Sequence, residues 1–87
     1  MLVVEVADPS LAIDREQKSG LYARARVPEY WIVNLNDRVL EVYREPGPDT
    51  SALYGWAYRA AQTLNAGEQV SPLAASTARI AVADLLS

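Results

Sequence analysis

The chain has 87 residues, of which 51% are hydrophobic and 22% charged, and its formal net charge is −3. This composition fits one small globular domain, and the absence of cysteine and histidine excludes disulfides, thiolate or imidazole zinc sites and Cys–His or Ser–His nucleophile pairs. The acidic balance disfavours non-specific binding to duplexes, no apolar run is long enough to span a bilayer, and no signal peptide is recognisable, so we expect a cytoplasmic protein without a membrane partner.

The first predicted element is a buried strand over residues 2–7, a valine-rich run interrupted by Glu5. Charged side chains are rarely buried without a partner, so Glu5 needs a metal ion, a cation or a path to solvent. A helix carrying Lys18 is expected to follow over about residues 14–26, because apolar residues repeat there at helical spacing and Pro28 stops it.

The rest of the chain is predicted to be mostly strands. They are expected at residues 30–33, 38–43, 54–64 and 78–82, with a Pro- and Gly-rich loop over 45–51, a turn over 65–68 and a helical turn over 84–86. A strand, a helix and a strand within about thirty residues predict a parallel pair with a right-handed crossover. We therefore expect one α/β (α+β) domain over residues 1–87 with a mixed sheet and one crossover helix.

Glu5 and Lys18 are the candidate site. Lys18 and Tyr22 lie one helical turn apart, on a stripe that could bring the ammonium group towards Glu5. A carboxylate that holds a divalent cation, beside a lysine that positions water or neutralises developing charge, suits phosphodiester hydrolysis. Only hard oxygen ligands remain in this chain, which favours magnesium, manganese or calcium, and one carboxylate is too few to fix magnesium well.

Each of these residues also has a simpler interpretation. Glu5 could be an edge-strand glutamate facing water, and Lys18 a solvated helix lysine or the partner of Asp14 in a surface ion pair. Tyr22 is predicted to be a core residue and Glu29 an exposed residue at a strand start.

Three stretches in order carry a family resemblance. They are Leu2-Val3-Val4-Glu5-Val6, then Asp14-x-x-x-Lys18-x-x-x-Tyr22, then Val27-Pro28-Glu29-Tyr30-Trp31-Ile32-Val33. Together they resemble the Uma-type restriction endonuclease family of the PD-(D/E)XK nuclease superfamily, over most of the chain and most tightly over residues 2–42.

The resemblance implies a restriction-endonuclease-like sheet, DNA as the substrate and Mg²⁺ or Mn²⁺ as the cofactor. It implies that Glu5 and Lys18 are catalytic, with Lys18 as a migrated lysine because Ala7 occupies the usual lysine position. It also implies Glu5 and the backbone carbonyl of Val6 as metal ligands.

The chain departs from the family pattern in two places. The family's first motif, a Pro-Asp whose aspartate is the principal metal ligand, would lie before Met1, so we expect a partial domain truncated at its N-terminal side, with an incomplete metal site and little or no cleavage by the isolated chain. Arg26 stands where relatives usually have glycine, which predicts a lost or strained helix cap.

The remaining alternatives concern the surface. Arg24 and Arg26 could touch phosphate, but the helix dipole explains two arginines at a helix C-terminus equally well. Asp8 either ends its strand or assists the site electrostatically. The rival function is a non-enzymatic remnant that self-associates through an exposed sheet edge, which predicts dimers or aggregates. A sequence-specific DNA-binding module is disfavoured because the sequence has no basic stripe.

Overall fold

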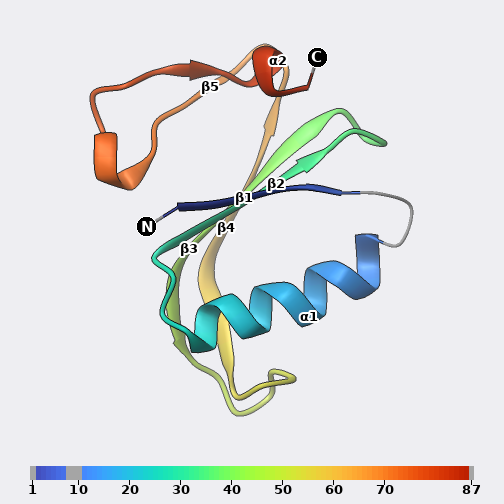
Figure 1. Cartoon of the computed structure of the whole chain (residues 1–87), viewed down its shortest axis with the longest axis vertical. Coiled ribbons are helices and arrows are strands. Elements are labelled where there is room, and N and C mark those ends of the chain that lie inside the picture. The colour runs from blue at the N-terminus through green and yellow to red at the C-terminus, as the bar shows by residue number, and fades with distance from the viewer. Residues whose placement is uncertain (1, 8–10, 87) are drawn as a thin grey trace.

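The computed structural model describes residues 2–7 and 11–86, and the side chains of residues 2–6 and 17–86. The elements are β1 Leu2–Ala7, α1 Leu11–Arg24, β2 Glu29–Asn34, β3 Val39–Pro48, β4 Trp56–Asn65, β5 Gln69–Val70, the 3₁₀ helix η1 Leu73–Ala75, β6 Ile80–Ala81 and α2 Val82–Leu85 (Figure 1). This confirms the mixed α+β class. In the part of the chain described, no helix is long and apolar enough to cross a membrane.

The main sheet has four strands in the order β1-β2-β3-β4, and β5 pairs with β6 in a separate ribbon. β1 and β2 are parallel, with Glu5 opposite Ile32, whereas β2–β3 and β3–β4 are antiparallel. The predicted parallel pair joined by a crossover helix is therefore confirmed. α1 begins before the predicted residue 14 and ends at Arg24, two residues earlier than predicted.

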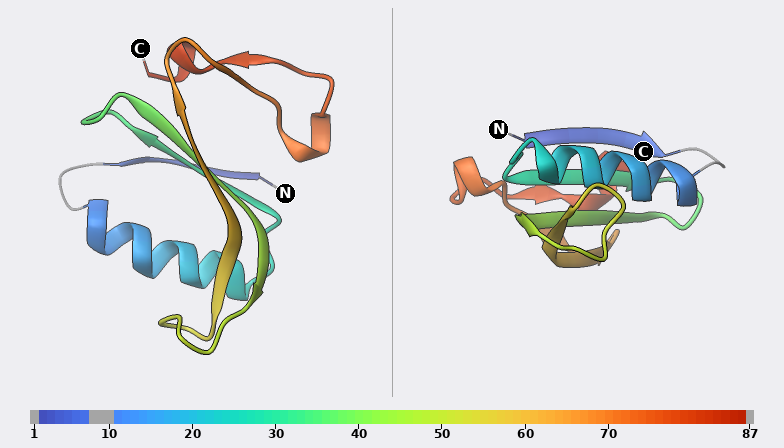
Figure 2. Two further views of the ribbon diagram at one scale, coloured as in Figure 1. Left: turned by 180° about the vertical axis from the view of Figure 1, so that it is seen from behind. Right: turned by 90° about the horizontal axis from the view of Figure 1, so that it is seen from below.

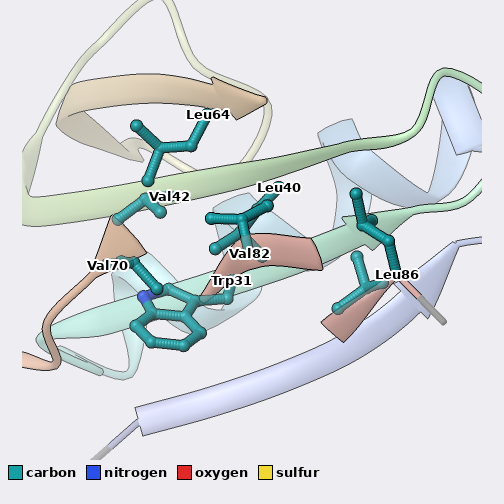
Figure 3. Packing of buried hydrophobic residues seen from close by; sticks show 8 residues of the cluster. Trp31, Leu40, Val42, Leu64, Val70, Val82 and Leu86 are labelled. Carbon is teal, nitrogen blue, oxygen red and sulfur yellow. The ribbon is translucent and has the colours of Figure 1, made fainter. Parts of the chain in front are cut away.

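The two faces of this sheet have different covers. α1 lies along one face and the C-terminal segment from β5 to α2 lies against the other (Figures 1 and 2). The face towards the C-terminal segment carries the apolar core (Figure 3). Its buried residues are Trp31, Val33, Leu40, Val42, Leu64, Val70, Val82 and Leu86. Since strand side chains alternate, Glu5, Tyr30, Glu41 and Tyr43 face α1 instead.

The loop predicted over residues 45–51 is partly wrong, because β3 continues through Pro46 to Pro48. Proline lacks the N–H that a central strand must donate. Here β2 pairs with β3 only as far as Arg44, so beyond that point β3 has β4 as its sole neighbour in the sheet and proline is tolerated. The strand predicted over 78–82 is also shorter, since β6 covers only Ile80–Ala81 and Val82 begins α2.

Glu29 is buried, at 1% exposure, so the prediction that it is exposed is wrong. Arg44 donates through Nε to Oε2 of Glu29 at 2.7 Å, and the indole N–H of Trp31 donates to the same oxygen at 2.8 Å. Oε1 accepts the backbone N–H of Leu73 at 2.9 Å, while Arg44 also donates to the carbonyl of Ser71 at 2.7 Å. This buried ion pair therefore ties the C-terminal segment to the sheet.

The C-terminus of α1 is closed by a left-handed residue. Arg26 has φ of 61°, its N–H donates to the carbonyl of Ala23, and the N–H of Val27 donates to the carbonyl of Tyr22. These two bonds define a Schellman cap, in which glycine is the usual left-handed residue. The predicted strain at Arg26 is thus present, while the cap itself is kept.

Candidate functional site

The carboxylate of Glu5 is held by three side chains on the α1 side of the sheet. Tyr22 donates its hydroxyl to Oε1 at 2.7 Å, and Tyr30 donates its hydroxyl to Oε2 at 3.2 Å. The ammonium Nζ of Lys18 lies 3.1 Å from the same Oε2. The structure therefore brings together Glu5 and Lys18, as the helical stripe predicted, and adds two tyrosines to them.

Local structure explains how these groups meet. Lys18 and Tyr22 are four residues apart on α1, so their side chains share one face of the helix. In the parallel register Val3 lies opposite Tyr30, which puts Tyr30 on the same sheet face as Glu5 and one step earlier along the strands. Asp8 and the side chain of Asp14 lie outside the described residues, so their suggested roles stay predictions.

Counting lone pairs shows what Glu5 can still bind. A carboxylate has about four acceptor positions. Oε2 accepts from Tyr30 and faces Lys18, while Oε1 accepts from Tyr22 alone. Among the described residues, Oε1 therefore has one position left for water, a cation or another donor.

The same contacts set the protonation states. Burial raises the pKa of Glu5, but the hydrogen bonds from Tyr22 and Lys18, the charge of Lys18 and the hydrogen bond from Tyr30 outweigh it, and the net pKa lies below the ordinary 4.5. The hydrogen bond to Glu5, followed by burial, raises the pKa of Tyr22 above 10.0. At neutral pH the site thus contains an ionised carboxylate beside neutral phenols.

Tyr30 anchors an aromatic cluster under the site. It is 1% exposed, and its ring centroid lies 4.9 Å from that of Tyr22, 5.9 Å from Tyr43 and 6.4 Å from Tyr58. Burial raises the pKa of Tyr30 well above its ordinary range. Tyr22 was expected to be a core residue; it is half-buried and its hydroxyl is committed to Glu5. The i, i+4 spacing from Lys18 was the signal available for that contact.

Glu41 is a second buried carboxylate on the α1 side, two strands away from Glu5. It accepts hydrogen bonds from Asn34 at 3.1 Å and from the Tyr43 hydroxyl at 2.6 Å. Among the described side chains, those of residues 2–6 and 17–86, no three acidic groups lie together as a metal cage would require. The described carboxylates therefore fit only a Mg²⁺-type ion that takes most of its ligands from water and phosphate, with Glu5 as one ligand.

A family model named Uma2, described as "Putative restriction endonuclease", matches residues 1–83. No curated protein and no solved structure matches the chain.

Proposed function

This chain belongs to the Uma2 family, and we propose that it is a divalent-metal-dependent endonuclease domain that hydrolyses phosphodiester bonds in DNA through Glu5 and Lys18. The observation that carries the proposal is the Lys18 ammonium 3.1 Å from an ionised Glu5 carboxylate that two tyrosines hold in place. An ammonium group and a carboxylate at one point are the charges that phosphoryl transfer to water needs.

Each of the two residues has a separate task. The side chain of Lys18 is 46% exposed, so its ammonium group can meet a phosphate and stabilise the negative charge that builds on the phosphoryl oxygens. Glu5 is 26% exposed, and the open position on its Oε1 is where it would hold the metal ion. Tyr22 and Tyr30 do not touch substrate in this scheme but keep the carboxylate in one orientation.

We propose Mg²⁺ or Mn²⁺ as the cofactor. Glu5 would bind it through Oε1, with the carbonyl of Val6 as the second predicted ligand. When bound, such an ion polarises the phosphate and lowers the pKa of its water. Because the described residues supply a single carboxylate, we expect weak affinity and weak cleavage.

Plasmid nicking tests this proposal. The assay compares Mg²⁺, Mn²⁺ and a chelator, using the unmodified chain, Lys18→Met and the control Arg79→Gln, which removes an exposed positive charge elsewhere. We expect weak nicking that the chelator and Lys18→Met abolish and that Arg79→Gln leaves unchanged. Nicking that survives the chelator, or that Lys18→Met does not alter, would contradict the proposal.

A non-enzymatic role in self-association is the second candidate, and one observation favours it. β1 lies at one edge of the main sheet, where Val4 is 46% and Val6 is 66% exposed (Figure 2). An exposed apolar edge strand can pair with the edge of a second copy. Light scattering of the unmodified chain and of Val6→Lys tests this: the first should be a dimer and the second a monomer. A stable monomer at high concentration would exclude this candidate.

A further inference from the structure

Two arginines at the C-terminal end of α1 stack on aromatic rings of the β3–β4 hairpin. The Arg24 guanidinium carbon lies 5.9 Å from the ring centroid of Tyr54, and that of Arg26 lies 5.5 Å from Trp56. Both arginines are exposed. In the described part of the chain neither has a carboxylate within ion-pair distance, so the N–H groups at the edges of both guanidinium planes are available to an anion.

The hairpin that carries the rings of Tyr54 and Trp56 is fixed against the helix. The ring of Tyr54 packs so closely on Gly20 that a Cβ there would lie 2.9 Å from its Cδ2. The hydroxyl of Tyr58 donates to the carbonyl of Val27 at 2.7 Å, which joins β4 to the end of the helix. Stacking on fixed rings limits the motion of the guanidinium groups, so less freedom is lost when they bind.

Arg26 adds a separate observation. It occupies the left-handed position of the Schellman cap at φ of 61°, where a glycine would be relaxed. Arg38 and Glu45 also have positive φ, at 56° and 61°, so it is the stack on Trp56 and the exposed guanidinium that distinguish Arg26 among these strained residues. A side chain kept there at that cost, with its guanidinium exposed, is consistent with a role for the guanidinium itself.

We propose that Arg24 and Arg26 form a subsite for backbone phosphates of DNA that flank the phosphate at Lys18. Arginine forks match phosphate geometry, and in an acidic chain this pair is a local positive surface complementary to a polyanion. Arg24 lies six residues beyond Lys18, which is about 9 Å along the helix axis and about 120° around it, at about 100° for each residue. The two side chains therefore leave different sides of α1, and one DNA backbone can contact both only by curving around the end of the helix.

This subsite rests on the proposed function, because it assumes that DNA reaches Lys18. In this proposal the DNA backbone curves around the C-terminal end of α1, from Lys18 towards the hairpin. The competing explanation is that the two stacks only fasten the hairpin to the helix. A fastening role predicts a lower melting temperature on substitution, with no change in the salt dependence of DNA binding.

Fluorescence anisotropy with a labelled DNA duplex in chelator separates these explanations without requiring cleavage. Arg24→Gln/Arg26→Gln is compared with Arg59→Gln/Arg79→Gln, which removes the same charge from two other exposed positions. We expect the slope of log K against log salt to fall in magnitude by about 1.8 for the first pair, at about 0.9 for each lost phosphate contact. The control pair should keep the original slope.

Equal slopes for the two double variants, or a fall in melting temperature with no change of slope, would overturn the subsite while DNA binding by the unmodified chain still supports the proposed function. If the unmodified chain binds no duplex even at low salt, both the subsite and the DNA nuclease proposal are wrong. Arg24→Lys/Arg26→Lys keeps the charge, so it should retain most of the salt slope and bind less tightly.

Discussion

Each face of the main sheet carries one glutamate paired with one cation, and the two pairs differ in how far solvent reaches them. On the C-terminal side, Glu29 and Arg44 have side-chain exposures of 2% and 27%, and both oxygens of Glu29 are taken by donors from three segments. On the α1 side, Glu5 is 26% and Lys18 is 46% exposed. The same residue chemistry is structural where the carboxylate is buried, and available for reaction where solvent reaches it.

The surroundings of the two pairs follow the same division. The face with Glu29 also carries the apolar core around Trp31 and Leu40, whereas the face with Glu5 carries a cluster of tyrosines with titratable hydroxyls. Changes on the first face should therefore alter stability, and changes on the second should alter chemistry and pH dependence.

The largest expected effect is on the core face. Leu40 is 0% exposed, so Leu40→Ala should lower the free energy of unfolding by about 2–5 kcal/mol. Val4 lies on the same face but is 46% exposed, and Val4→Ala should change it by less than about 0.5 kcal/mol. Urea denaturation measures both. Similar losses for the two variants would show that the core does not lie where the structure places it.

The tyrosine face should respond to alkali. Burial, followed by the charge of Tyr22, raises the pKa of Tyr58 from 10.0 to about 12, so folding favours its neutral form. That contribution is complete below the unfolded pKa of 10.0 and is lost as pH rises towards 12. Urea melts across this window should show falling stability, and Tyr58→Phe should flatten the decline. A decline just as steep in Tyr58→Phe would assign it to other groups.

Removing the Tyr22 hydroxyl should have a smaller effect. It donates to an ionised carboxylate in a half-buried position, so Tyr22→Phe should cost about 1 kcal/mol of stability. Tyr54→Phe is the matched control, since Tyr54 contributes its ring to Arg24 and Gly20. If both variants unfold at the same urea concentration as the unmodified chain, the Tyr22 bond contributes nothing measurable.

The smallest expected difference concerns the end of α1. Arg26→Ala and Arg26→Gly both remove the stack on Trp56, but only glycine relieves the left-handed backbone. Arg26→Gly should therefore be about 1 kcal/mol more stable than Arg26→Ala. Equal melting temperatures for the two would show that the cap is not left-handed in solution.

The sequence predicted the elements that depend on local pattern. Valine-rich residues 2–7, the helical stripe through Lys18 and the strand after Pro28 were sufficient for the parallel crossover and for the meeting of Glu5 with Lys18. The crossover and the Glu5–Lys18 pair both follow from apolar periodicities within about thirty residues of chain.

What the sequence missed depends on distant partners. Glu29 was predicted to be exposed because nothing near it in sequence shows that Arg44 and the backbone of Leu73 reach its carboxylate. Pro46 indicated a loop because proline usually interrupts strands. The pairing of β3 with β4 at this position depends on residues that are distant in sequence. The catalytic and metal-binding roles of Glu5 and Lys18 stay predictions, since geometry places the groups but not the reaction.

The most direct test compares Glu5→Gln with Glu29→Gln, in both metal-dependent plasmid nicking and urea denaturation. Glu5→Gln should abolish nicking and change the free energy of unfolding by less than about 1 kcal/mol, because Gln still accepts the Tyr22 hydroxyl. Glu29→Gln leaves Arg44, which is 27% exposed, without its carboxylate, so it should cost about 1.5–3 kcal/mol, with nicking retained per folded molecule. Nicking unchanged by Glu5→Gln, or lost in folded Glu29→Gln, would contradict the division between the two faces.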